Sequence, residues 1–157
     1  MTDLPHDDYM TAVVDALTTV GLDPADVTLD DSDTRGSYCY LRALMRFTPE
    51  TTYGMTQEVW PHGLLLIWEW HTGIEADQGE PERGPVWLWA KCLSDGSNRE
   101  PEPLPVPGDA NPVQVAWALA ELINHAEPGR QRIGQWTGAS ALNAACEAWA
   151  AEEASDA

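Results

Sequence analysis

The chain has 157 residues, of which 43% are hydrophobic, and its 26 acidic side chains outnumber eight Lys and Arg to give a formal net charge of −18. A chain of this length and apolar content is expected to fold as one domain, residues 1–157, without a disulfide or a metal. Charge of this sign repels nucleic acid and anionic membrane surfaces. We therefore expect no direct nucleic-acid or membrane binding and favour a basic protein partner.

Cysteine usage and the N-terminal residues indicate a cytoplasmic protein. Cys39, Cys92 and Cys146 form no close pair, and a sparse, odd count is typical of a reducing compartment. Residues 1–8 carry aspartates where a signal peptide needs cations. No apolar run approaches the roughly 18 residues that a membrane-spanning helix needs.

The first part of the chain predicts one helix and then an acidic linker. Apolar residues recur at helical spacing over residues 9–20, and Gly21 ends the helix. Residues 23–33 are interpreted as a linker with at most a short strand at 27–29. Nine aspartates and no Lys or Arg occur before residue 34.

Three segments with alternating apolar residues predict strands. Residues 38–47 have one wholly apolar face, residues 63–71 alternate after an apolar start, and residues 85–93 place two tryptophans on one face. Four prolines over residues 94–108 restrict any further strand, near 104–106, to a short edge strand. The apolar phases of these elements and of the first helix are expected to be buried, namely Val13, Leu17, Leu41, Ala43, Met45, Phe47, Leu64 and Leu66.

A second helix is predicted after the prolines. Asn111 can cap it, Pro112 can occupy its first position, and Pro128 ends it. Its expected buried stripe consists of Val113, Ala116, Trp117, Ala120 and Ile123.

A third, Ala-rich helix is predicted to begin at Thr137 or Ser140. Residues 1–7 and 152–157 are expected to be flexible tails. Strands in a run form an antiparallel meander. The sequence therefore predicts an α+β fold, with a small antiparallel sheet of three to four strands and with N-terminal and C-terminal helices packed on one face.

Two Trp-x-Trp sequences, at residues 68–70 and 87–89, are the most informative local feature. Residues two apart in a strand share a face, so a hairpin would bring four indoles onto one sheet surface. They either pack against the helices as core or form an exposed contact surface, since Trp is enriched at binding hot spots. The candidate partner-binding residues are Trp68, Trp70, Trp87 and Trp89 and, from the acidic linker, Asp26, Asp30, Asp31 and Asp33.

No motif indicates a metal, a cofactor or covalent catalysis. No two Cys or His residues have the spacing of a zinc site, and the acidic turn at residues 73–84 lacks the order of a calcium-binding loop. No Ser-nucleophile or phosphate-loop motif occurs. Pairing Glu58 or Glu69 with His62 or His71 as acid and base is geometrically open but has no supporting motif. We predict no catalytic residue, no cofactor and no metal.

One strand face combines aromatic and basic residues. Tyr38 and Tyr40 share it with Arg42 and Arg46, an arrangement similar to a platform for single-stranded nucleic acid. Two arginines in a chain of charge −18 would still meet strong repulsion from phosphates. This interpretation is therefore not preferred.

Several short motifs follow one another between residues 64 and 123, namely Leu66-x-Trp68, the strand with Trp87 and Trp89, Leu104-Pro105-Val106, and Asn111-Pro112 with Val115 and Leu119 in the following helix. In this order they resemble an actinobacterial family of domains of unknown function, over roughly residues 8–125. The Gly-Trp step of that family corresponds here to Gly84-Pro85-Val86-Trp87, which differs from it. The resemblance implies the fold and no activity.

We expect a non-catalytic protein-interaction or regulatory module that binds a protein partner through its Trp-bearing sheet surface or its acidic surface; a homodimer is compatible with the sequence. One alternative is an acidic DNA mimic that inhibits a DNA-binding protein, with the early aspartates and the turn at 75–82 as rows of carboxylates. The second alternative is an enzyme without a recognisable motif. An exposed apolar patch, carboxylates on one elongated face, or a pocket with convergent polar groups would distinguish the three.

Overall fold

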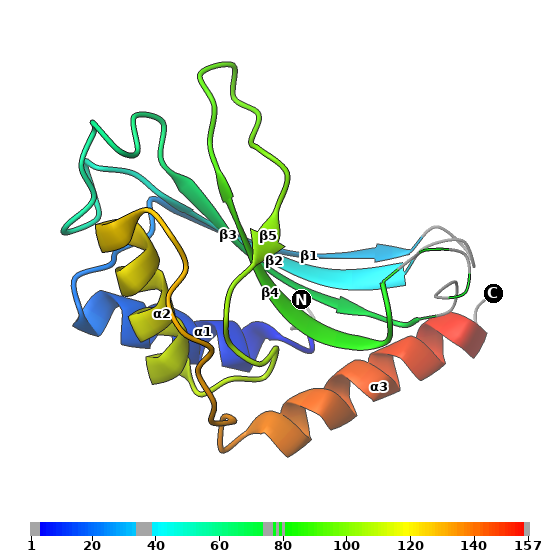
Figure 1. Cartoon of the computed structure of the whole chain (residues 1–157). Helices are drawn as coiled ribbons and strands as arrows, with labels where there is room; N and C mark the ends of the chain where they lie inside the picture. The colour runs from blue at the N-terminus through cyan, green and yellow to red at the C-terminus, as the bar shows by residue number, and fades with distance from the viewer. Residues whose placement is uncertain (1–3, 34–38, 74–76, 78, 80, 156–157) are drawn as a thin grey trace.

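The computed structural model describes residues 4–33, 39–73, 77, 79 and 81–155, which form a sheet with helices on one side (Figure 1). The predicted order of helix, strands, helix and helix is confirmed. The elements are α1 (Asp7–Thr19), β1 (Asp26–Asp33), β2 (Cys39–Phe47), β3 (Leu64–His71), β4 (Gly84–Lys91), β5 (Glu102–Pro103), α2 (Pro112–His125) and α3 (Ala139–Ser155).

The five strands form one antiparallel sheet in the order β1-β2-β3-β4-β5, so neighbours in the chain are neighbours in the sheet. The α+β class and the meander are confirmed, whereas the expected three to four strands are too few. Residues 26–33 form the eight-residue strand β1, where a linker with at most a short strand at 27–29 was predicted because aspartate disfavours strands. In the sheet, Asp26 and Asp30 lie opposite Arg46 and Arg42 of β2, and cross-strand pairs of opposite charge stabilise a sheet.

The short edge strand β5 lies beside β4, two residues earlier than expected. Leu104 and Val106, which were expected to form it, are buried instead. The Leu104 N–H donates to the Trp87 carbonyl at 3.0 Å, and the Val106 N–H donates back to the Leu104 carbonyl at 2.7 Å. The chain therefore turns from the sheet edge into the core at this point.

One face of the sheet carries the core. The register aligns Ala43, Trp68 and Trp87 across β2, β3 and β4, so the apolar phases of the three strands meet on the same face. All eight residues predicted to be core are buried, namely Val13, Leu17, Leu41, Ala43, Met45, Phe47, Leu64 and Leu66.

The helices lie on the side of this apolar face (Figure 1). Tyr9 of α1 packs edge-on against Trp68 and Trp87, and Trp149 of α3 packs edge-on against Trp70. α2 packs against α1. Within the described part of the chain, no helix lies over the opposite face of the sheet.

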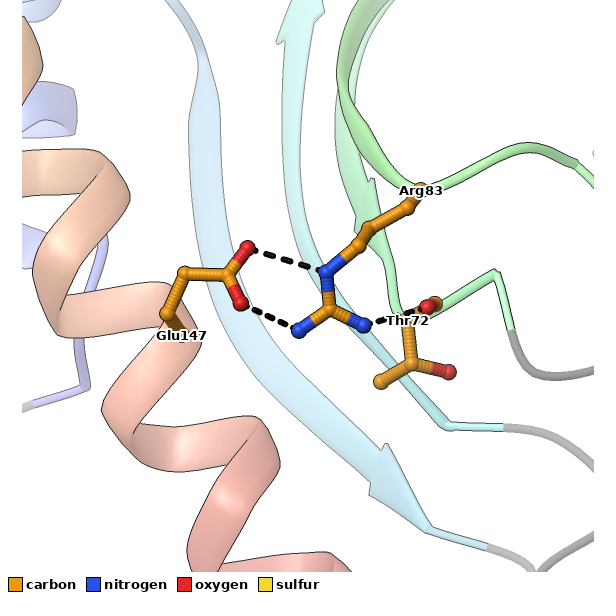
Figure 2. A network of polar contacts seen from close by, with 3 residues as sticks. All are labelled: Thr72, Arg83 and Glu147. Carbon is orange, nitrogen blue, oxygen red and sulfur yellow. Dashed lines mark hydrogen bonds and ion pairs between the residues drawn. The ribbon is translucent and has the colours of Figure 1, made fainter.

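Arg83, just before β4, links α3 to the sheet (Figure 2). Its guanidinium donates to both carboxylate oxygens of Glu147, with an Nε–Oε1 distance of 3.0 Å, and to the Thr72 carbonyl at 2.6 Å. The guanidinium also lies over the Trp70 ring, 5.2 Å from its centroid. Because a bidentate pair is geometrically specific, these contacts orient α3 relative to the connection between β3 and β4.

His6 is a core residue although it falls in a segment expected to be a tail. It is fully buried, its ring stacks on Trp68 with centroids 5.3 Å apart, and its Nε2 lies 2.8 Å from the Arg42 carbonyl oxygen. Burial lowers the pKa of His6 below its ordinary value of 6.5. At the other end of the chain, α3 continues to Ser155, into the second expected tail.

We expect the free energy of unfolding to decrease as the pH falls from about 7 to about 5.5. The unfolded chain takes up a proton at His6 near pH 6.5, but the folded chain does so only at lower pH, so protonation favours unfolding. Asp7, Asp30 and Asp31 oppose this shift without reversing it. Denaturant unfolding at several pH values in this range measures how the free energy of unfolding depends on pH. This dependence should be weaker in a His6→Gln variant and unchanged in the exposed control His62→Gln. An unchanged pH dependence in His6→Gln would contradict the prediction.

Candidate functional site

The four tryptophans of the sheet belong to the core. Trp68, Trp70 and Trp87 are fully buried and Trp89 is nearly so. Trp68 donates from Nε1 to the Gly108 carbonyl at 2.8 Å. Of the two interpretations that the sequence left open, packing against the helices is the one that the structure shows. The expectation of an exposed, Trp-bearing sheet surface is therefore corrected.

Trp117 on α2 is the most exposed of the eight tryptophans, with 52% of its surface accessible. Trp117 and Val113 were expected in the buried stripe of α2 and are exposed, so the prediction is wrong for these two; Ala116 and Ile123 of that stripe are buried and Ala120 is partly buried. α2 instead buries the face that carries Val115, Leu119 and Leu122. Because apolar residues occur around most of α2, helical periodicity could not identify the side that meets the core.

Two other exposed apolar side chains lie close to Trp117. Tyr53, in the connection between β2 and β3, is 83% exposed, and Val20, at the end of α1, is 44% exposed. We call Val20, Tyr53 and Trp117 the aromatic patch. It borders a cavity of about 230 Å³ that is lined by Val20, Leu22, Tyr53, Gly54, Ala116, Trp117, Ala120 and Asn124.

The backbone around the end of α1 fixes the position of Tyr53. Gly21 has a φ of 84°, and its carbonyl accepts a hydrogen bond from the Tyr53 N–H at 3.0 Å. The positive φ favours glycine, and a Cβ at Gly21 would lie only 3.2 Å from the Tyr53 Cβ, which leaves little room for a side chain. Thr52 is buried and donates from Oγ1 to the Asp23 carbonyl at 3.0 Å. The end of α1 and this connection therefore form one structural unit.

The remainder of the connection is anchored in the core. Trp60 is buried, donates from Nε1 to the Ile123 carbonyl at 3.0 Å, and packs edge-on against Trp89. Met55 is buried as well. Tyr53 thus projects from a segment that is held on both sides. An aromatic side chain on such a fixed segment offers a large contact area and loses little conformational entropy on binding.

Tyr53 was not among the predicted binding residues. The sequence feature that could have indicated it is an aromatic residue next to Gly54, in a connection where no apolar periodicity assigns the residue to the core. An aromatic side chain that no core pattern explains is a candidate for a binding surface.

The acidic candidates lie along β1, at the edge of the sheet. Asp26 and Asp31 are exposed, and Asp30 is partly buried. Asp30 Oδ2 accepts a hydrogen bond from Arg42 at 3.2 Å. Asp26 lies opposite Arg46 in the register. The Asp30 carboxylate is therefore paired with an arginine of β2 and contributes less to a free row of negative charge.

Several expectations fall outside the described part of the chain. They concern Tyr38, residues 75, 76 and 80 of the acidic turn, and the side chain of Asp33. The common face expected for that turn and the early aspartates thus involves residues outside the described part of the chain. The DNA-mimic alternative stays a prediction.

The sheet face away from the helices carries a polar cluster. His71 Nε2 lies 3.1 Å from Glu69 Oε1, and the His71 and Tyr40 rings have centroids 5.9 Å apart. Arg42 lies over the Tyr40 ring, 5.4 Å from its centroid, while it pairs with Asp30. The pairing of Glu69 with His71, which the sequence left open, thus reaches hydrogen-bonding distance. Arg42, one of the two arginines of the nucleic-acid platform that the sequence did not favour, is paired with a carboxylate.

The described thiols are poorly suited to nucleophilic catalysis. Cys146 is buried, and burial together with the nearby Glu147 raises its pKa to about 12. Burial also raises the pKa of Cys92. A thiol needs a lowered pKa to act as a nucleophile near neutral pH.

The described residues contain neither a candidate metal-binding cluster nor a helix that could span a membrane. Within residues 4–33, 39–73, 77, 79 and 81–155, no group of three or more His, Cys, Asp or Glu side chains could hold a metal ion. None of the helices in this part of the chain combines the length and the apolar content that crossing a bilayer requires.

Comparisons with protein-family models, with curated proteins and with solved structures found no match for this chain. The resemblance to an actinobacterial family over roughly residues 8–125 therefore stays an expectation. No functional residue is carried over from a relative, and function is inferred from the surface of this chain.

Proposed function

We propose that this protein is a non-catalytic interaction module that binds a protein partner through the aromatic patch. The observation that carries the proposal is the exposure of Tyr53 and Trp117 beside one apolar cavity. Tyrosine and tryptophan are enriched among the residues that dominate binding energy at interfaces. The four tryptophans of the sheet, in contrast, are buried and pack in the core.

The size of the cavity supports a side chain as its occupant. Small-molecule sites enclose about 300–1,000 Å³, and this cavity encloses about 230 Å³. Its lining is mostly apolar, with Asn124 as a polar residue at the rim. It therefore suits one bulky aliphatic or aromatic side chain that a partner inserts between Tyr53 and Trp117.

The net charge of the chain further limits the class of protein partner that it can bind. A net charge of −18 repels acidic proteins and attracts basic ones over distances of about a Debye length. We therefore propose a partner that presents an apolar anchor residue within a neutral or basic surface. The anchor supplies affinity, and the surrounding charge increases the association rate.

A pair of matched variants tests this proposal. Wild-type protein is used to capture partners from cell extract, and the affinity of each purified candidate is then measured. Trp117→Ala should weaken binding at least about 30-fold, which corresponds to the 2 kcal/mol or more of an interface hot spot. Ile133→Ala removes an apolar side chain that is more exposed than Trp117 and does not line the cavity, and it should leave the affinity unchanged.

Circular dichroism should show that both variants keep the wild-type fold, because neither side chain is buried. Tyr53→Ala should weaken binding in the same direction as Trp117→Ala. Equal affinity of wild type and Trp117→Ala for every captured partner would contradict the aromatic patch as the binding site.

A further inference from the structure

α1 and β1 form a second groove, at the edge of the sheet. It encloses about 250 Å³ and has an apolar floor of Met10, Val14, Val27 and Leu29. Val27 is among the exposed large hydrophobic residues of the protein. The groove shares no lining residue with the cavity at the aromatic patch. It is therefore a separate surface.

The groove runs beside an open strand edge. β1 occupies one end of the strand order and pairs only with β2 in the described part of the chain. Its N–H and C=O groups on the other side have no ladder partner there. β1 is eight residues long. An edge strand of this length is a template for pairing with an extended segment of another chain.

The charges differ between the two faces of β1. On the outer face, Asp26 and Asp30 lie opposite arginines of β2. On the groove side, Asp31 follows Val27 and Leu29 in the same phase of the strand and is exposed. The groove itself has two carboxylates and no Lys or Arg among its lining residues, which are Asp7, Met10, Thr11, Val14, Asp15, Val27 and Leu29.

We propose that the free edge of β1 binds an extended segment of a protein partner that carries both apolar residues and Lys or Arg at the positions facing the groove, which are every second residue of the segment. The main chain of this segment adds a strand to β1, its groove-facing apolar side chains enter the groove, and its groove-facing cations meet Asp7, Asp15 and Asp31. This site is independent of the aromatic patch.

A second copy of this protein is a poor occupant of the same edge. Pairing two β1 strands would bring two aspartate-rich edges together, and like charges on neighbouring strands destabilise a sheet. The aspartates thus keep copies of the protein apart while they favour a cationic strand. Charge complementarity selects the cationic segment.

The test uses three synthetic octapeptides and two charge-matched variants of the full chain. The probe carries Val and Lys in turn at every second position, with Thr between them, so that Val and Lys share one face of the added strand. One control peptide carries N-methyl groups on alternate backbone nitrogens and keeps its charge, and the other replaces every Lys with Gln. The variant Asp15→Asn/Asp31→Asn removes two charges at the groove, and Glu100→Gln/Glu127→Gln removes two elsewhere on the surface. Binding is measured calorimetrically at low salt, and amide exchange is followed over β1.

The Lys-Val peptide should bind and should slow amide exchange within residues 26–33. The groove variant should bind it about tenfold more weakly, and the distant variant should bind it within about twofold of wild type. Neither control peptide should bind comparably. Equal binding of the N-methylated peptide, equal loss in both variants, or no binding of the Lys-Val peptide would overturn the proposal. Trp117→Ala should bind this peptide normally, which separates this site from the proposed function.

Discussion

A Phe47→Ala variant is expected to lose about 3–5 kcal/mol of its free energy of unfolding. Phe47 is the last residue of β2, has no accessible surface, and lies opposite Leu64 in the sheet. The neighbouring Gly63 has no room for a side chain, since a Cβ there would lie 2.3 Å from the Phe47 carbonyl oxygen. This tight backbone contact limits the collapse of the cavity that the missing ring would leave.

Urea unfolding monitored by tryptophan fluorescence measures this loss. The slope of the free energy against urea should stay unchanged, because the same surface is exposed on unfolding. Val113→Ala serves as the control and should change stability by less than about 0.5 kcal/mol, because Val113 lies on the exposed side of α2. A loss below about 1 kcal/mol for Phe47→Ala would mean that the ring is not packed as described.

Tyr9→Phe is expected to destabilise the fold although it removes a single oxygen atom. The Tyr9 hydroxyl donates to the Ala110 carbonyl at 2.5 Å and accepts a hydrogen bond from Trp87 Nε1 at 3.2 Å, and both contacts are buried. Without the hydroxyl, a buried acceptor and a buried donor lose this partner. Each unsatisfied group costs about 1–3 kcal/mol.

Thermal and urea unfolding of Tyr9→Phe, Trp87→Phe and the double variant test this prediction. The double variant should be less destabilised than the sum of the two single variants, because the hydroxyl and the indole N–H share one hydrogen bond. Tyr53→Phe is the exposed control and should leave stability unchanged within about 0.5 kcal/mol. Wild-type stability of Tyr9→Phe would contradict the hydrogen-bonded arrangement.

α1 contributes to both proposed binding surfaces and to the core. Its end supplies Val20 to the aromatic patch, its middle supplies Met10 and Val14 to the groove, and Tyr9 packs between the sheet tryptophans. Variants that disturb Tyr9 are therefore unsuitable as tests of binding. The surface substitutions proposed above avoid this, because Trp117, Asp15 and Asp31 are exposed.

The sequence by itself determined the elements whose apolar residues repeat with a clear period. The alternation in β2 predicted the buried set from Leu41 to Phe47, and two-residue spacing placed Trp68 and Trp70 on one face. Asn111 predicted the start of α2, where its side chain accepts from the Val113 N–H at 2.9 Å. These features depend on neighbours in the chain, so local spacing suffices to predict them.

Tertiary structure alone decided that residues 26–33 form a strand and which aromatic side chains are exposed. Residues 26–33 form a strand beside β2, which places Arg42 and Arg46 opposite Asp30 and Asp26, residues 12 and 20 positions away in the chain. Trp117 is exposed because α2 turns another apolar side to the core, and it meets Tyr53 only when α1, α2 and the β2–β3 connection pack together. Periodicity shows which residues share a face. Exposure depends on what distant segments place over that face, and this is a property of the folded chain.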